Sequence, residues 1–191
     1  MSLFELYLKL GFRHIVDIHG YDHIVFVLAL CAGYDLKLIK KVLILITAFT
    51  IGHSVTLVLS TLNILLIPAR IIEFLIPVTI FITAVSNLLP IKKSKGKIVY
   101  LIALFFGLIH GLGFSYYLKE LLGRESSIIK PLFAFNIGLE IGQIVILLIY
   151  FLTLLLATKL LNLKQNHWRS FISILAMGIS VVLIIQKYPW Y

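Results

Sequence analysis

The chain has 191 residues, of which 61% are hydrophobic, and a formal net charge of +9 at pH 7, with a mean hydropathy of +1.07. Soluble domains are about 45–50% apolar, and here the excess runs along almost the whole length, which excludes a soluble domain with a large core. The 17 basic residues lie in short gaps between apolar runs, so they indicate membrane topology and not a nucleic-acid surface. We expect an all-α polytopic membrane protein that forms a single domain over residues 1–191.

The predicted elements begin with a short helix within the first 14 residues, whose apolar side chains share one helical face. This pattern favours a helix in the membrane interface, or an extension of the first span. A spanning helix needs about 20 mostly apolar residues, and six later segments qualify, although the first is short. These segments are Gly20–Gly33, Val42–Leu62, Ile71–Leu89, Ile98–Leu122, Leu132–Ala157 and Ser170–Lys187.

The basic residues between these segments give the expected orientation. Ten of them follow the first, third and fifth spans, including Lys92, Lys93 and Lys95, and seven lie on the opposite side, including Arg124. Cytoplasmic loops carry the excess of Lys and Arg. The pattern therefore places both termini outside and the three basic loops in the cytoplasm, with the chain in the plasma (inner) membrane.

Ionisable side chains inside spans are costly and usually mark function. Asp22 and His23 open the first span, His53 and His110 lie midway along the second and fourth, and Glu140 lies in the fifth. Any one histidine alone is often a hydrogen-bond partner between helices, and Asp22 and His23 also suit a helix cap. The remaining ionisable groups, such as Asp17, His19 and His167, are expected at headgroup level or in solvent.

The spacing along the helices permits these side chains to share one layer. His53 and His110 lie 11 and 12 residues from the cytoplasmic starts of their spans, and Glu140 lies 8 residues from an outer start. At 1.5 Å per residue these are depths of about 16–18 Å and 12 Å, inside a core about 30 Å thick. Glycines flank His110 and Glu140 at spacings that favour close packing of the fourth predicted span on the fifth.

Imidazoles together with carboxylates suit a borderline divalent cation such as Ni²⁺, Co²⁺ or Zn²⁺. Neutral histidine supplies a nitrogen ligand, and a carboxylate either compensates the charge of the cation or orients a histidine. The chain has one cysteine and two methionines, which argues against a Cu⁺ site, because that ion prefers sulfur ligands.

Four motifs, in this order, resemble the HupE/UreJ family of bacterial membrane proteins: "GYDHIVFVLAL", "TAFTIGHSVTL", "FGLIHGLGFS" and "FNIGLEIGQ". The resemblance is strongest from Gly11 to Gln143, and the sixth span is generic. Family members are described as nickel or cobalt permeases linked to hydrogenase and urease maturation. Carried over by position, the resemblance implies a metal site of His14, Asp22, His23, His53, His110 and Glu140.

The chain also departs from the pattern of the family's nickel permeases. Those place a His-Pro pair seven residues before the last histidine of the first motif, whereas here Val16 stands there and His14 lies nine residues before. Gly113 and Phe114 follow His110 in place of an Ala-His-Gly-x-Glu form. The chain thus resembles the broader branch of the family, and the metal is left open among nickel, cobalt and zinc.

The leading hypothesis is a permease for a divalent transition-metal cation. The alternative is an intramembrane zinc hydrolase, because three histidines and a carboxylate around Zn²⁺ activate water for amide or lipid hydrolysis. A third reading is a small membrane scaffold with buried polar pairs. The expected partners are membrane lipid and the metal ion, with no nucleic acid, and association into a homo-oligomer is left open.

Overall fold

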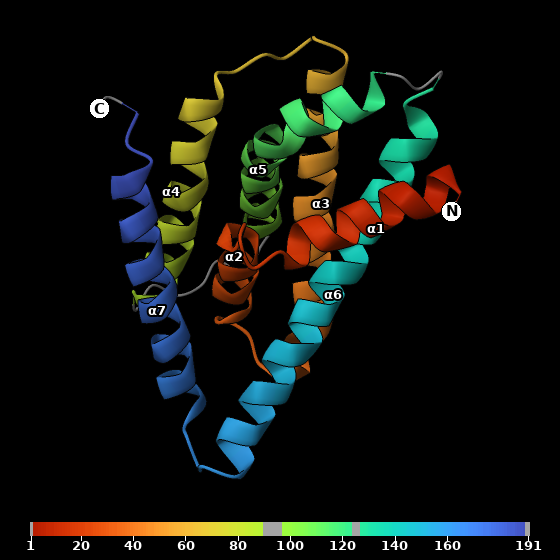
Figure 1. Cartoon of the computed structure of the whole chain (residues 1–191). Helices are drawn as coiled ribbons and strands as arrows, with labels where there is room; N and C mark the ends of the chain where they lie inside the picture. The colour runs from red at the N-terminus through yellow and green to blue at the C-terminus, as the bar shows by residue number, and fades with distance from the viewer. Residues whose placement is uncertain (1, 90–96, 124–126, 190–191) are drawn as a thin grey trace.

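The computed structural model describes residues 2–89, 97–123 and 127–189, and these residues form helices without any strand. The predicted all-α fold is confirmed (Figure 1). The helices are α1 Leu3–Val16, α2 Asp22–Cys31, α3 Ile39–Thr61, α4 Ala69–Leu88, α5 Ile98–Leu122, α6 Ile129–Lys159 and α7 Gln165–Gln186, with a short 3-10 turn η1 Leu36–Leu38 before α3.

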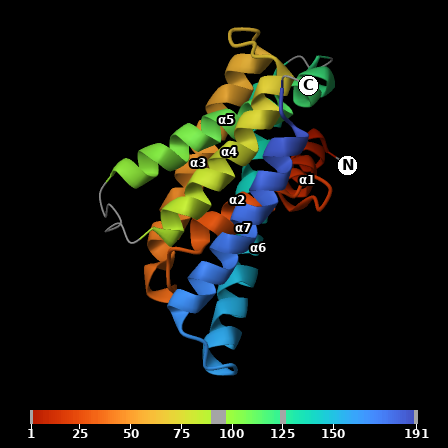
Figure 2. The ribbon, with the colours of Figure 1, turned by 90° about the vertical axis from the view of Figure 1, so that its left-hand side faces the viewer.

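Five of these helices, α3 to α7, are long and apolar enough to cross a membrane. They correspond to the second to sixth predicted spans, and the chain is a multi-pass membrane protein. The long helices run side by side, and the loops α2–α3 and α6–α7 reach the same end of the bundle (Figures 1 and 2). Both loops belong to the basic set that gave the expected orientation, whereas Lys92, Lys93, Lys95 and Arg124 lie outside the described residues.

The first predicted span, Gly20–Gly33, is not a full span. Its helix is α2, with ten residues, which is about 15 Å long and half the thickness of a hydrocarbon core. Six of the ten side chains are buried, and α2 packs against α4, α6 and α7. An apolar run of this length is typical of a helix buried in a core, and α2 is such an internal helix at the centre of the bundle (Figure 1).

The predicted N-terminal helix is present as α1, and it packs against α6. Ser2 and Glu5 form a capping box at its start, in which each side chain accepts a hydrogen bond from the backbone N–H of the other residue. A Cβ atom at Gly11 would lie 2.0 Å from the carbonyl oxygen of Phe135 on α6. The two backbones are therefore in direct contact, which fixes the end of α1 inside the bundle.

The helices α3 and α5 form the other close pair, and glycines again allow the contact. A Cβ atom at Gly107 of α5 would lie 2.1 Å from the carbonyl oxygen of Phe49 on α3, and one at Gly52 would lie 2.1 Å from that of Leu104. The prediction that the glycines near His110 and Glu140 pack against each other is wrong. Those of α5 face α3 and α4, and those of α6 face α1.

Candidate metal site

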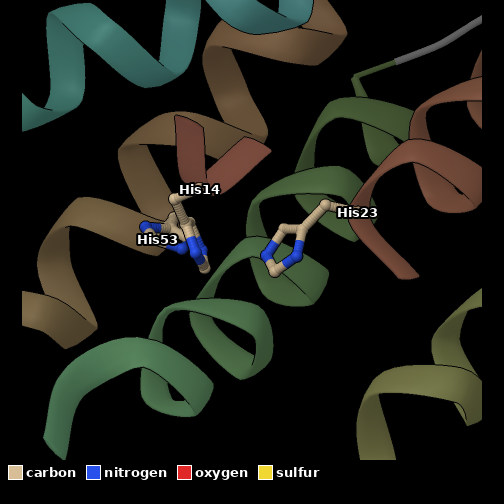
Figure 3. Close-up of side chains that lie close together, drawn as sticks. All are labelled: His14, His23 and His53. Atoms are coloured by element: carbon tan, nitrogen blue, oxygen red, sulfur yellow. The ribbon is translucent and has the colours of Figure 1, made fainter. Parts of the chain in front are cut away.

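Three histidines from three different helices converge at one point inside the bundle. His14 comes from the last turn of α1, His23 from the first turn of α2 and His53 from the middle of α3. One ring nitrogen from each lies within 4.8 Å of the corresponding nitrogen of the other two. Figure 3 shows the ring nitrogens facing a common space.

The packing of α1 and α3 explains how residues so far apart in sequence meet. The close contact of α1 with α6 brings His14 to the centre, one turn beyond Gly11. Gly52 directly precedes His53 and lets α3 pack closely against α5. The exposed loop after Val16 then turns the chain, so that His23 approaches His14 with their ring centroids 4.6 Å apart.

The histidine cluster holds an unusual number of unpaired polar atoms. Nε2 of His14, Nε2 of His23 and both ring nitrogens of His53 are buried and have no hydrogen-bond partner among the described residues. Leaving one buried polar group unsatisfied costs about 1–3 kcal/mol. Native proteins keep few such groups, and four of the thirteen in the described residues lie at this one point, which makes it the candidate ligand site.

Asp22 fixes the orientation of the neighbouring imidazole. Its carboxylate lies 2.9 Å from Nδ1 of His23, and an ionised carboxylate only accepts hydrogen bonds. Nδ1 of His23 therefore carries the proton and donates it to Asp22, and the lone pair is on Nε2, the nitrogen without a partner. A carboxylate that orients a histidine in this way is the usual support of a metal ligand.

His110 lies beside the cluster, with its ring centroid 5.1 Å from that of His23. Its Nε2 is 2.9 Å from Oγ1 of Thr79 on α4, and that hydroxyl donates its own proton to the carbonyl of Ile76. Nε2 of His110 is therefore the donor to Thr79, which leaves the lone pair on Nδ1. This nitrogen is also buried and without a partner among the described residues.

Phenylalanine rings pack against three of the histidines, His14, His53 and His110. Phe114 lies 4.0 Å from the ring of His14, and Phe26 lies 4.7 Å from that of His110, measured between centroids. Phe49 and Phe135 complete the wall, on α3 and α6. In such apolar surroundings the attraction between a bound cation and the Asp22 carboxylate is stronger than in water.

Glu140 does not belong to this cluster. Its carboxylate accepts a hydrogen bond of 2.8 Å from the hydroxyl of Thr47, and one turn further on Thr50 donates to Oε1 of Gln143, also at 2.8 Å. The group of ligand nitrogens within 4.8 Å includes neither Glu140 nor His110. Of the six residues predicted as metal ligands, the fold brings together His14, His23 and His53, with Asp22 and His110 in contact around them.

A second Asp–His pair lies in the loop between α1 and α2. Asp17 and His19 are 3.2 Å apart, with side chains 50% and 90% exposed, as expected for residues outside the site. The backbone N–H of His19 donates to the Asp17 carboxylate and lowers the pKa of that carboxyl. Thr79 and Phe114 were not predicted to contact the site, because only the pairing of helices reveals which threonine or phenylalanine faces a given histidine.

A comparison with protein-family models matches residues 1–189 to the model described as HupE / UreJ protein. No curated protein matches the chain, and no solved structure does.

Proposed function

The chain belongs to the HupE/UreJ family, and on this premise we propose that it transports a divalent transition-metal cation, nickel or cobalt, through an intramembrane site formed by His14, His23 and His53. The observation that carries the proposal is the convergence of these three imidazoles with unpaired buried nitrogens. The same convergence would be costly in a protein that only needed to fold.

The donor set matches the chemistry of the proposed cargo. Imidazole nitrogens suit nickel, cobalt and zinc better than calcium or magnesium, which prefer oxygen ligands. Nitrogens that share one such ion lie about 3–4 Å apart, given metal–nitrogen distances of about 2.0–2.1 Å. The nitrogens here lie within 4.8 Å, so side-chain movements of about 1 Å would complete the coordination.

Asp22 and His110 take supporting roles in this proposal. Asp22 keeps the free lone pair of His23 directed at the cluster and compensates part of the charge of a divalent cation. His110 presents a bare Nδ1 next to His23 and would receive the ion from the first three ligands. We place the protein in the inner membrane with both termini outside, so that the ion would enter from the side of α1.

Uptake of radioactive Ni²⁺ or Co²⁺ by cells that express the chain tests this function. Expression should raise uptake, and His23→Ala should return it to the level of cells without the protein. His167→Ala is the matched control, because His167 lies on the exposed start of α7 and should leave uptake unchanged. Equal uptake with and without the protein, across the first-row divalent metals, would refute the proposal.

One feature also fits the alternative of an intramembrane zinc hydrolase. Catalytic zinc sites use three protein ligands and leave one position for water, and here three histidines form the group. Such an enzyme holds its metal through purification, whereas a carrier must release its cargo. Metal analysis of the purified protein, before and after dialysis against a weak chelator, separates them: one equivalent of retained zinc favours the hydrolase.

A further inference from the structure

The hydrogen bond between Thr47 and Glu140 lies on the outside of the bundle, in a part of the protein that crosses the membrane. Both side chains are accessible there, since Thr47 is exposed and Glu140 is partly exposed. Thr47 lies 8 residues after the start of α3 and 14 before its end, or about 12 Å and 21 Å along the helix. In a hydrocarbon core about 30 Å thick, the pair faces acyl chains.

Acyl chains provide neither a hydrogen-bond partner nor a counter-charge for a carboxyl group. Ionisable residues within spans almost always face the protein interior, a water-filled cavity or a polar partner. The single hydroxyl of Thr47 neutralises no charge, and the remaining oxygen of Glu140 also needs a donor when it is ionised, or an acceptor when it is protonated. An exposed carboxyl at this depth therefore indicates that another protein surface covers it.

The residues around the pair form a surface suited to helix packing, which we call the α3–α6 face. On α3, Ile44 and Ile51 are 53% and 51% exposed and stand three residues before and four after Thr47. On α6, Ile144 is 37% exposed and lies one turn beyond Glu140. Apolar residues at spacings of three and four form the ridge that a neighbouring helix packs against.

We propose that the α3–α6 face binds a second copy of this chain, with Thr47 and Glu140 of each copy at the interface. Two copies related by a two-fold axis along the membrane normal present the same residues at the same depth. Each polar pair therefore meets a polar pair, with no further requirement on the sequence. The Thr47 hydroxyl donates and the carboxyl oxygens of Glu140 accept, so each copy offers the other a donor and acceptors, and the pair is complementary to itself, as a two-fold interface demands.

Cysteine crosslinking in native membrane vesicles tests this interface. Cys31 is the only cysteine and is fully buried, so the unmodified chain gives the background. Ile44→Cys and Ile51→Cys should form disulfide-linked dimers on mild oxidation with iodine. Ile174→Cys is the control, since Ile174 on α7 is 55% exposed but lies outside the α3–α6 face.

A second substitution tests whether the polar pair contributes. Added to Ile51→Cys, Glu140→Leu should lower the dimerisation constant about three- to thirtyfold, the range measured for hydrogen bonds between helices in membranes. Glu140→Gln should keep the dimer, because an amide also donates and accepts. Glu140 lies at the surface of the bundle and is partly exposed, so after either change the protein should still insert at normal levels.

Three results would overturn the proposal. One is a monomer at both α3 positions, with no more crosslinking than at Ile174. Another is a crosslinked product whose mass corresponds to a different protein. The last is equal dimerisation of the Glu140→Leu and Glu140→Gln variants, because the carboxyl would then have no part in the interface.

Discussion

The histidine cluster and the α3–α6 face are both polar regions in helices that cross a membrane, and they differ in two respects. Four ring nitrogens of the cluster are buried and have no partner within the described part of the chain, whereas Thr47 and Glu140 are accessible and bonded to each other. A donor or acceptor that is buried and unpaired can be satisfied only by a small ligand, because another protein cannot reach it. A hydrogen-bonded pair at the surface is accessible to the surface of a second protein. Burial and pairing together therefore separate two roles that the residue types alone do not distinguish.

The largest effect is expected from a substitution that removes the polar atoms of His53 and keeps the size of the side chain. His53→Leu should abolish stoichiometric binding of Ni²⁺ and Co²⁺, measured by calorimetry on the purified protein. Without metal, the variant should be more stable than the parent by about 1 kcal/mol or more, because two buried nitrogens without partners are gone. A lower melting temperature of the metal-free variant would show that His53 serves the fold and not a ligand.

The two Asp–His pairs offer a second test, because they share their chemistry and differ in burial. Asp22→Ala should weaken metal binding about 10- to 100-fold, the usual loss when the carboxylate behind a histidine ligand is removed. Asp17→Ala removes the corresponding carboxylate from the exposed pair with His19 and should change the affinity less than about twofold. Equal effects of both changes in a metal titration would mean that burial does not distinguish the pairs.

The cluster should also depend on close packing of α3 against α5. Gly107→Ala places a methyl group 2.1 Å from the carbonyl oxygen of Phe49 and should destabilise the protein by about 1–3 kcal/mol, with weaker metal binding as His53 moves. Gly178→Ala on α7 meets no atom within 4 Å and should be neutral or slightly stabilising. Thermal unfolding in detergent compares the two variants, and a neutral Gly107→Ala would disprove the close contact.

The smallest effect on metal affinity is expected from a substitution of Glu140. Glu140→Gln replaces the carboxyl of the α3–α6 face with an amide and preserves its hydrogen bonding. Metal affinity should stay within about twofold of the parent, because Glu140 lies outside the ligand group. A loss of tenfold or more in the same titration would restore Glu140 to the metal site, as the sequence first suggested.

The local features of this protein could be predicted from the sequence. Hydropathy is a property of each segment by itself, and it located α3 to α7 and the membrane class. The cost of placing an ionisable side chain in a span singled out His23, His53 and His110. The family resemblance added His14, which lies in a segment too polar to be noticed as part of a span.

The packing of the helices against one another could be learned only from the tertiary structure. The ten residues of α2 resemble a shortened span in sequence, and their burial by α4, α6 and α7 makes them an internal helix. Glu140 and His53 have similar predicted depths, yet one faces outward and the other the cluster. The direction in which a side chain points is set by which helices pack together. That choice depends on close contacts such as Gly11 with Phe135 and Gly107 with Phe49, between residues that no local pattern connects.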